Sequence, residues 1–157
     1  MTASRNGAVA RAAGHFDSGE FVAGLGRLVA HPTQSQLPGA LPALASYLGD
    51  VVGAELGTLG FALEIFDNPD PGAGPVLLAT RHEGDDLPSV LIYGHGDVVA
   101  GQDDKWRAGL APWNVTPDGD RLYGRGTADN KGQHWTNIGG LRAVIAERGR
   151  LGFNCTI

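Results

Sequence analysis

The chain has 157 residues, of which 42% are hydrophobic and 18% charged, and its formal net charge is −5. This length and composition are typical of one globular domain with a buried core. The acidic charge balance argues against nucleic acids and anionic membranes as partners, because both are bound through basic patches. A lone cysteine, Cys155, and a first segment without an apolar leader predict a protein of the reducing cytoplasm.

Two helices are predicted first along the chain. Apolar residues at helical spacing predict a helix over about residues 18–29, with Asp17 or Ser18 as its N-cap. A second helix is predicted over residues 37–57, where two prolines are tolerated because they lie near its first turn.

The apolar pattern then changes to that of β-strands. Residues 61–66 and 75–81 are each followed by a turn-rich segment, and they predict two strands. Residues 89–94, SVLIYG, are apolar on both faces, which predicts a central strand of a covered sheet.

The last third is predicted to contain a hairpin, a helix and a strand. Residues 99–123 include a hairpin with PDGD at its turn, residues 130–148 predict a long helix, and RLGFNCTI begins another strand. Helices mixed with strands in this order predict an α/β fold with a mixed, mostly parallel sheet flanked by helices.

Two side chains at the end of the third strand carry chemistry. In VLIYGHGDVV, residues 90–99, His95 and Asp97 alternate along an extended chain, so their side chains point to the same side. One use of such a pair is metal binding, in which the imidazole holds the ion through one nitrogen and the carboxylate orients the ring through the other. The alternative is a hydrogen-bonded histidine at a strand end, with the aspartate capping a turn.

A second stretch, LYGRGTADNKGQ over residues 122–133, places Asp129 and Asn130 at the start of the long helix. Taken alone, a carboxylate at this position is most simply a helix N-cap. The glycine spacing fits neither a Walker A phosphate loop nor the dinucleotide-binding G-x-G-x-x-G pattern. A nucleotide-binding domain is therefore disfavoured.

Together the two stretches resemble the zinc-dependent exopeptidases and amidohydrolases, the family of acetylornithine deacetylase, succinyl-diaminopimelate desuccinylase, aminoacylase and carnosine dipeptidase. The resemblance rests on GHGDVV, on Asp129 of GRGTADNKG 34 residues after His95, and on the pattern W…PW…DGDRLYGRG between them. It extends from about His31 to the end of the chain. It implies a zinc exopeptidase-like catalytic domain that hydrolyses amide bonds of dipeptides or N-acyl amino acids.

The resemblance also implies a role for each motif residue. His95 would bind one metal ion, and Asp129 would bridge two zinc ions through its two oxygens, with cobalt or manganese as alternative metals. Asp97 would contribute to catalysis by orienting His95 and supporting the neighbouring general base. The peptide bond between Asp129 and Asn130 is expected to be cis.

Three further residues are candidates for contacts around the metal or the substrate. Asn130 follows the bridging aspartate, and His134 lies about one helical turn later, close enough to face the site, although helix histidines more often pack or lie at the surface. Arg125 could meet a substrate carboxylate, and an ion pair with Asp118 or Asp120 is the equal alternative.

The sequence departs from the family pattern in its ligands. A catalytic zinc has roughly three protein ligands, whereas this chain offers His95 and Asp129, and none of its glutamates stands where the family has its general base. We therefore expect residues 1–157 to be the N-terminal part of a catalytic domain, inactive alone, with the remainder and a dimerisation domain absent from the chain. The resemblance suggests a homodimer for the longer protein. The alternative is a noncatalytic fragment that binds metal weakly or packs against a partner chain.

Overall fold

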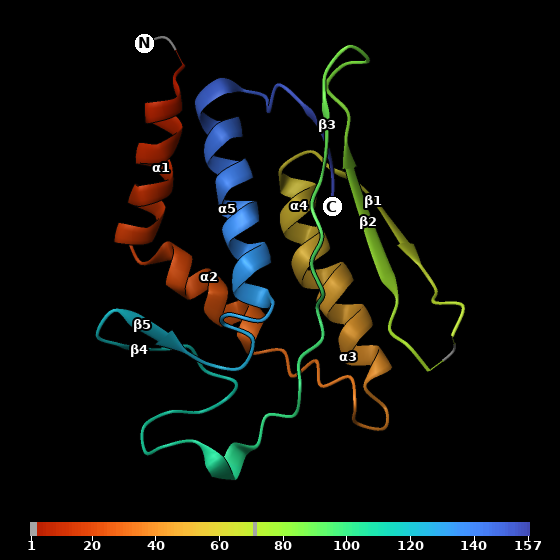
Figure 1. The fold of residues 1–157 in the computed structure, drawn as a ribbon, viewed down its shortest axis with the longest axis vertical. Coiled ribbons are helices and arrows are strands. Elements are labelled where there is room, and N and C mark those ends of the chain that lie inside the picture. Colours follow the sequence, from red (N-terminus) through yellow and green to blue (C-terminus); the bar gives the residue numbers. More distant parts are fainter. Residues whose placement is uncertain (1–2, 71) are drawn as a thin grey trace.

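The computed structural model describes residues 3–70 and 72–157, and Figure 1 shows them as a layer of helices beside a strand-rich region. The helical elements are α1 (Arg5–Asp17), α2 (Glu20–Val29), α3 (Leu41–Ser46), the π-helix η1 (Tyr47–Gly53), α4 (Ala54–Thr58), the 3₁₀ turn η2 (Asp103–Lys105) and α5 (Lys131–Arg148). The strands are β1 (Ala62–Phe66), β2 (Val76–Arg81), β3 (Ser89–Leu91), β4 (Thr116–Asp118), β5 (Arg121–Tyr123) and β6 (Asn154–Thr156).

Four of the strands form one sheet in the order β1-β2-β6-β3, and β4 and β5 form the predicted hairpin. Strand β2 pairs antiparallel with both β1 and β6, and β3 pairs parallel with β6. The sheet is mixed, as predicted. In the described residues, however, antiparallel pairings outnumber the parallel one, contrary to the expectation of a mostly parallel sheet. The reason is local: β1 and β2 are joined by a short connection, which permits only antiparallel pairing.

The position of β3 also differs from the prediction. Residues 89–94 were expected to form a central strand, but β3 has three residues, lies at the sheet edge, and leaves Leu91 77% and Tyr93 80% exposed. The inner position belongs to β6, whose Cys155 is buried. A short apolar run shows that a strand forms but carries no information on its place in the sheet.

The first helix has no counterpart in the predictions. Helix α1 contains mostly small residues with weak apolar periodicity, and the Ser4 hydroxyl caps it by accepting a hydrogen bond from the Gly7 amide at 3.0 Å. Helix α2 begins at Glu20 after Gly19, which has a φ of 83°, so neither Asp17 nor Ser18 is its N-cap. The chain changes direction between α1 and α2 at that glycine, because glycine accepts a left-handed conformation without a Cβ penalty.

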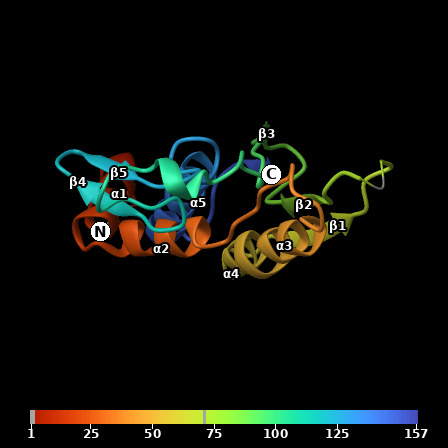
Figure 2. The same cartoon turned by 90° about the horizontal axis from the view of Figure 1, so that it is seen from below.

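The predicted second helix exists, and it runs without a break over α3, η1 and α4, starting at Leu41 rather than residue 37. Figure 2 shows α3 and α4 on one side of strands β1 and β2. No helix within residues 3–70 and 72–157 combines the length and apolar character needed to cross a membrane.

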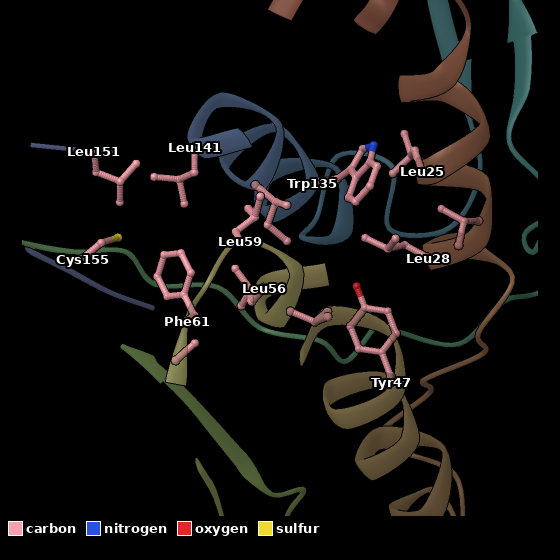
Figure 3. Close-up of a cluster of buried hydrophobic side chains, with 14 residues drawn as sticks. Leu25, Leu28, Tyr47, Leu56, Leu59, Phe61, Trp135, Leu141, Leu151 and Cys155 are labelled. Atoms are coloured by element: carbon pink, nitrogen blue, oxygen red, sulfur yellow. The ribbon is translucent and has the colours of Figure 1, made fainter. Parts of the chain in front are cut away.

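Helix α5 organises the core. It lies beside α1 and α2, and its Trp135 packs with Leu25, Leu56 and Tyr47 in the cluster drawn in Figure 3. The indole nitrogen of Trp135 donates a hydrogen bond to the Phe21 carbonyl at 2.9 Å. The N-terminal part of α5 is thereby held against α2.

Candidate metal centre

The segment that follows β3 runs as extended chain past the start of α5. A side chain at either of its two glycines would crowd a neighbour: a Cβ at Gly94 would lie 3.0 Å from Asn130 Oδ1, and one at Gly96 would lie 2.8 Å from the buried ring of Tyr47. The glycines therefore let the backbone approach α5 and η1 closely. This close approach places His95, between them, over the start of α5.

His95 lies between two carboxylates. Its Nε2 is 2.9 Å from Asp129 Oδ1, and its Nδ1 is 3.0 Å from Asp97 Oδ1. The His95 side chain is 36% exposed and that of Asp129 is 84% exposed. Both line a cavity of about 220 Å³, together with Asp97 and the loop residues 124–128. The two side chains thus converge at an open face of the molecule, as the metal hypothesis requires.

The carboxylates control the charge of His95. Partial burial lowers the pKa of this imidazole, but hydrogen bonds to Asp129 and Asp97 and the negative charge of Asp97 outweigh burial and raise it above 6.5. An arrangement that favours an imidazolium also favours a metal cation, because in both cases positive charge is placed between two carboxylates.

The donor set fits part of a zinc site. An imidazole nitrogen and a carboxylate oxygen are typical zinc ligands, and here they face each other across 2.9 Å. Over residues 3–70 and 72–157, however, there is no group of three or more histidine, cysteine, aspartate or glutamate side chains close enough to hold an ion. His95 and Asp129 can therefore supply two ligands, and a complete site needs others.

Asn130 and His134 lie beneath the backbone that carries His95. The Asn130 side-chain oxygen accepts a hydrogen bond from the His95 amide at 3.2 Å, and the Asp129–Asn130 peptide bond is cis, as expected. His134 is buried and hydrogen-bonded to the Tyr47 hydroxyl. Burial, together with the charges of Lys131 and His95, lowers the pKa of His134 to about 4, so this imidazole is neutral.

Arg125 lines the same cavity as His95 and Asp129. The alternative, an ion pair of Arg125 with Asp118 or Asp120, is not formed: Asp118 pairs with Arg107, and Asp120 lies 3.9 Å from Arg121. The Arg125 guanidinium instead lies over the Trp106 ring, 5.7 Å from its centroid, and makes a long 3.4 Å hydrogen bond to a backbone carbonyl.

Two residues near the site escaped the sequence predictions. Lys131 is fully buried, its ammonium donates to the carbonyls of Leu28 and His31, and burial lowers its pKa to about 7. Ser35 donates a hydrogen bond to Asp97 Oδ2 at 2.7 Å. Neither role could be predicted from the neighbouring sequence, since a lysine in a helix and a serine in a loop are ordinarily solvated surface residues.

The comparisons with known proteins agree with this geometry. Residues 91–156 match the model of peptidase family M20/M25/M40. An acetylornithine deacetylase from Erwinia tasmaniensis is 32% identical over 106 residues, which cover 68% of this chain and 27% of that protein. A succinyl-diaminopimelate desuccinylase from Novosphingobium aromaticivorans is 32% identical over 121 residues, covering 76% of this chain and 31% of that protein.

A solved structure extends the similarity to the fold. The crystal structure of human carnosine dipeptidase 1 is 28% identical and superposes with a TM-score of 0.79, covering 96% of this chain and 33% of that one. The chain thus spans about a third or less of the length of these relatives. The matched segment includes both His95 and Asp129, and over residues 91–156 the chain is similar to peptidase family M20/M25/M40.

Proposed function

We propose that the protein of which these residues form part hydrolyses amide bonds of dipeptides or N-acyl amino acids at a zinc centre. The observation that carries the proposal is the 2.9 Å approach of His95 Nε2 and Asp129 Oδ1 at an open cavity. The relatives support the substrate class, since they are named as an acetylornithine deacetylase, a desuccinylase and a dipeptidase. All three names describe cleavage of an amide bond in a small molecule.

Each residue of the site has a proposed task. Bound zinc would supply the acidification of water and the polarisation of a carbonyl. His95 offers the Nε2 lone pair, and Asp97 keeps the ring proton on Nδ1. Asp129 would hold zinc through its two carboxylate oxygens, one of which faces His95 Nε2. The Arg125 guanidinium pairs with no carboxylate among the described residues. It could therefore bind the free carboxylate that such substrates carry.

We further propose that residues 1–157 are the N-terminal part of a catalytic domain, in a cytoplasmic protein that forms a homodimer. By itself this chain is expected to bind zinc weakly and to show no turnover. The two-ligand donor set supports this expectation, because catalytic zinc sites ordinarily have three protein ligands.

Calorimetric titration of the 157-residue chain with zinc tests the metal site. Wild type is expected to bind, and His95→Ala and Asp129→Asn are each expected to weaken binding at least about tenfold, since each removes one of two ligands. His82→Ala is the matched control, because His82 also pairs with an aspartate, Asp85, but lies on the exposed surface away from the site. Equal affinity of wild type and Asp129→Asn would contradict the proposal.

Turnover is tested on the longer protein. It is expected to contain zinc and to cleave a dipeptide or an N-acetyl amino acid, and removal of the metal by a chelator should abolish cleavage, with recovery on adding zinc back. A metal-free preparation with full activity would exclude the zinc mechanism.

A further inference from the structure

Asp97 has a second partner besides His95. While Asp97 Oδ1 faces His95 Nδ1 at 3.0 Å, Asp97 Oδ2 accepts a hydrogen bond from the Ser35 hydroxyl at 2.7 Å. Together with the contact between His95 Nε2 and Asp129 Oδ1, these bonds form an unbroken series from Ser35 through Asp97 and His95 to Asp129. The series joins a loop after α2 to the start of α5.

The loop that carries Ser35 is itself fixed against the His95 segment. The buried Thr33 hydroxyl donates to the Gly96 carbonyl at 2.6 Å, and the Thr33 carbonyl accepts from the Val98 amide at 2.9 Å. Gln34 forms a parallel β-bridge with Val98. The backbone on both sides of the Ser35–Asp97 bond is therefore already fixed. Forming this bond costs little conformational entropy, because no free loop has to be ordered.

We propose that Ser35 is a positioning residue that acts through Asp97 to set the orientation and tautomer of His95. The inference rests on the proposed metal-binding function, in which His95 must present the Nε2 lone pair. The Asp97 side chain is 42% exposed, so without a second contact its carboxylate is free to rotate away from the ring. Ser35 holds one oxygen and thereby keeps the other directed at His95 Nδ1, where the Asp97 backbone carbonyl also lies at 3.1 Å. Two acceptors at Nδ1 favour the proton there over Nε2, which faces the single oxygen of Asp129.

The structure offers a matched bond for comparison. Ser46 donates to Asp50 Oδ2 at 2.8 Å within the continuous helix of α3 and η1, a bond of similar length and also exposed, and neither residue is hydrogen-bonded to His95. If the Ser35 bond only stabilised the fold, removing it should resemble removing the Ser46 bond. The variants Ser35→Ala and Ser46→Ala therefore separate positioning from stability.

The test is the nitrogen-15 spectrum of the neutral His95 imidazole in the metal-free chain, recorded at a pH above the raised pKa of this ring. Wild type is expected to show mainly the tautomer with the proton on Nδ1. Ser35→Ala should change the tautomer ratio at least twofold toward protonated Nε2, Ser35→Thr should restore the wild-type ratio, and Ser46→Ala should leave it unchanged. The zinc affinity of Ser35→Ala is expected to fall about 3–10-fold, which is less than the roughly 10–100-fold cost of removing a group that directly contacts a ligand, because Ser35 acts through Asp97.

An unchanged tautomer ratio in Ser35→Ala, or an equal change in Ser46→Ala, would overturn the positioning role. The proposed function fails separately, through absence of zinc binding in wild type, because the tautomer is measured without metal. A ratio that depends on Ser35 in a chain that binds no zinc would sustain the Ser35–Asp97–His95 coupling and reject the zinc site.

Discussion

The backbone at Gly96 packs closely against Tyr47, and this packing positions His95 next to it. The ring of Tyr47 fills the space beside the Gly96 Cα, and Tyr47 is fully buried and bonded to His134, so it has little freedom to move away. A glycine in an extended segment is ordinarily a weakness, and here it is what allows an extended chain to lie against η1.

We predict that Gly96→Ala lowers the free energy of unfolding by about 1–3 kcal/mol, because the added methyl group overpacks against Tyr47. Urea denaturation of the two proteins measures this difference. Gly26→Ala, in the interior of α2 with open space around the new Cβ, should instead stabilise the protein by about 0.5–1 kcal/mol. Equal effects of the two substitutions would contradict the packing argument.

Glu83 is a buried anchor for the chain before β6. Its carboxylate accepts hydrogen bonds at 2.8 Å from the amides of Leu151 and Gly152 and from Arg81 Nε, and its side chain is 6% exposed. Burial alone would raise the pKa of this carboxyl, but the backbone bonds and the Arg81 charge lower it to about 2.

We predict that Glu83→Gln lowers the free energy of unfolding by about 2 kcal/mol at pH 7, because an ionised acceptor is lost. Since the pKa falls from 4.5 in the unfolded chain to about 2 in the fold, the contribution of Glu83 is complete above pH 4.5 and is lost as the pH falls toward 2. The stability difference between wild type and variant should therefore shrink from pH 7 to pH 3 in urea denaturation. A difference that does not change with pH would show that the charge is not involved.

At the element scale, β3 is an exposed edge strand. Val90, Leu91 and Tyr93 are 40%, 77% and 80% exposed, and the outer side of β3 pairs with no strand in the described residues. Unpaired backbone next to apolar side chains promotes association between chains.

We predict that Leu91→Lys reduces self-association of the 157-residue chain, measured by light scattering over a concentration series, without lowering its melting temperature. A lysine on an edge strand opposes edge-to-edge pairing. Val9→Lys places the same charge on α1, at another exposed apolar position, and should reduce association less. A larger effect of Val9→Lys would indicate that the helical surface, and not β3, mediates association.

Sequence patterns predicted most elements but not their places. The segments 61–66, 75–81 and 130–148 form β1, β2 and α5 within a residue or two of the expected bounds, because each has a strong period and clear breakers. Helix α1 was missed because its small residues show little apolar periodicity. The places of β3 and β6 in the sheet were not predictable, because strand register depends on distant partners.

At the scale of the whole molecule, Trp135 connects α5 to α2 and to the core around η1. It is 1% exposed, its indole nitrogen is bonded to the Phe21 carbonyl, and its ring lies against Gly24, where a Cβ would overlap it. Trp106, by contrast, is only partly buried and packs a loop through a bond to the Gly101 carbonyl at 2.8 Å.

We predict that Trp135→Ala lowers the free energy of unfolding by about 3–5 kcal/mol, the usual cost of removing a buried aromatic side chain. This is a large share of the total stability of a domain of this size, so the variant should be partly unfolded at 37 °C. Circular dichroism during urea denaturation measures the loss. Trp106→Ala should lower the free energy of unfolding clearly less. A larger loss for Trp106→Ala than for Trp135→Ala would contradict the central place of Trp135 in the core.

The sequence by itself determined the mixed α/β class and the bounds of β1, β2 and α5, because periodicity and turn residues are local properties of the chain. The pairing of His95 with Asp129 was predicted from the resemblance of two motifs to a known family, since Asp129 alone indicates a helix cap. Only the tertiary structure decided that β6 lies inside the sheet, that Lys131 is buried, and that Ser35 reaches Asp97 from 62 residues away. These features depend on which distant segments pack together, and that packing is set by burial and hydrogen bonding summed over the whole chain.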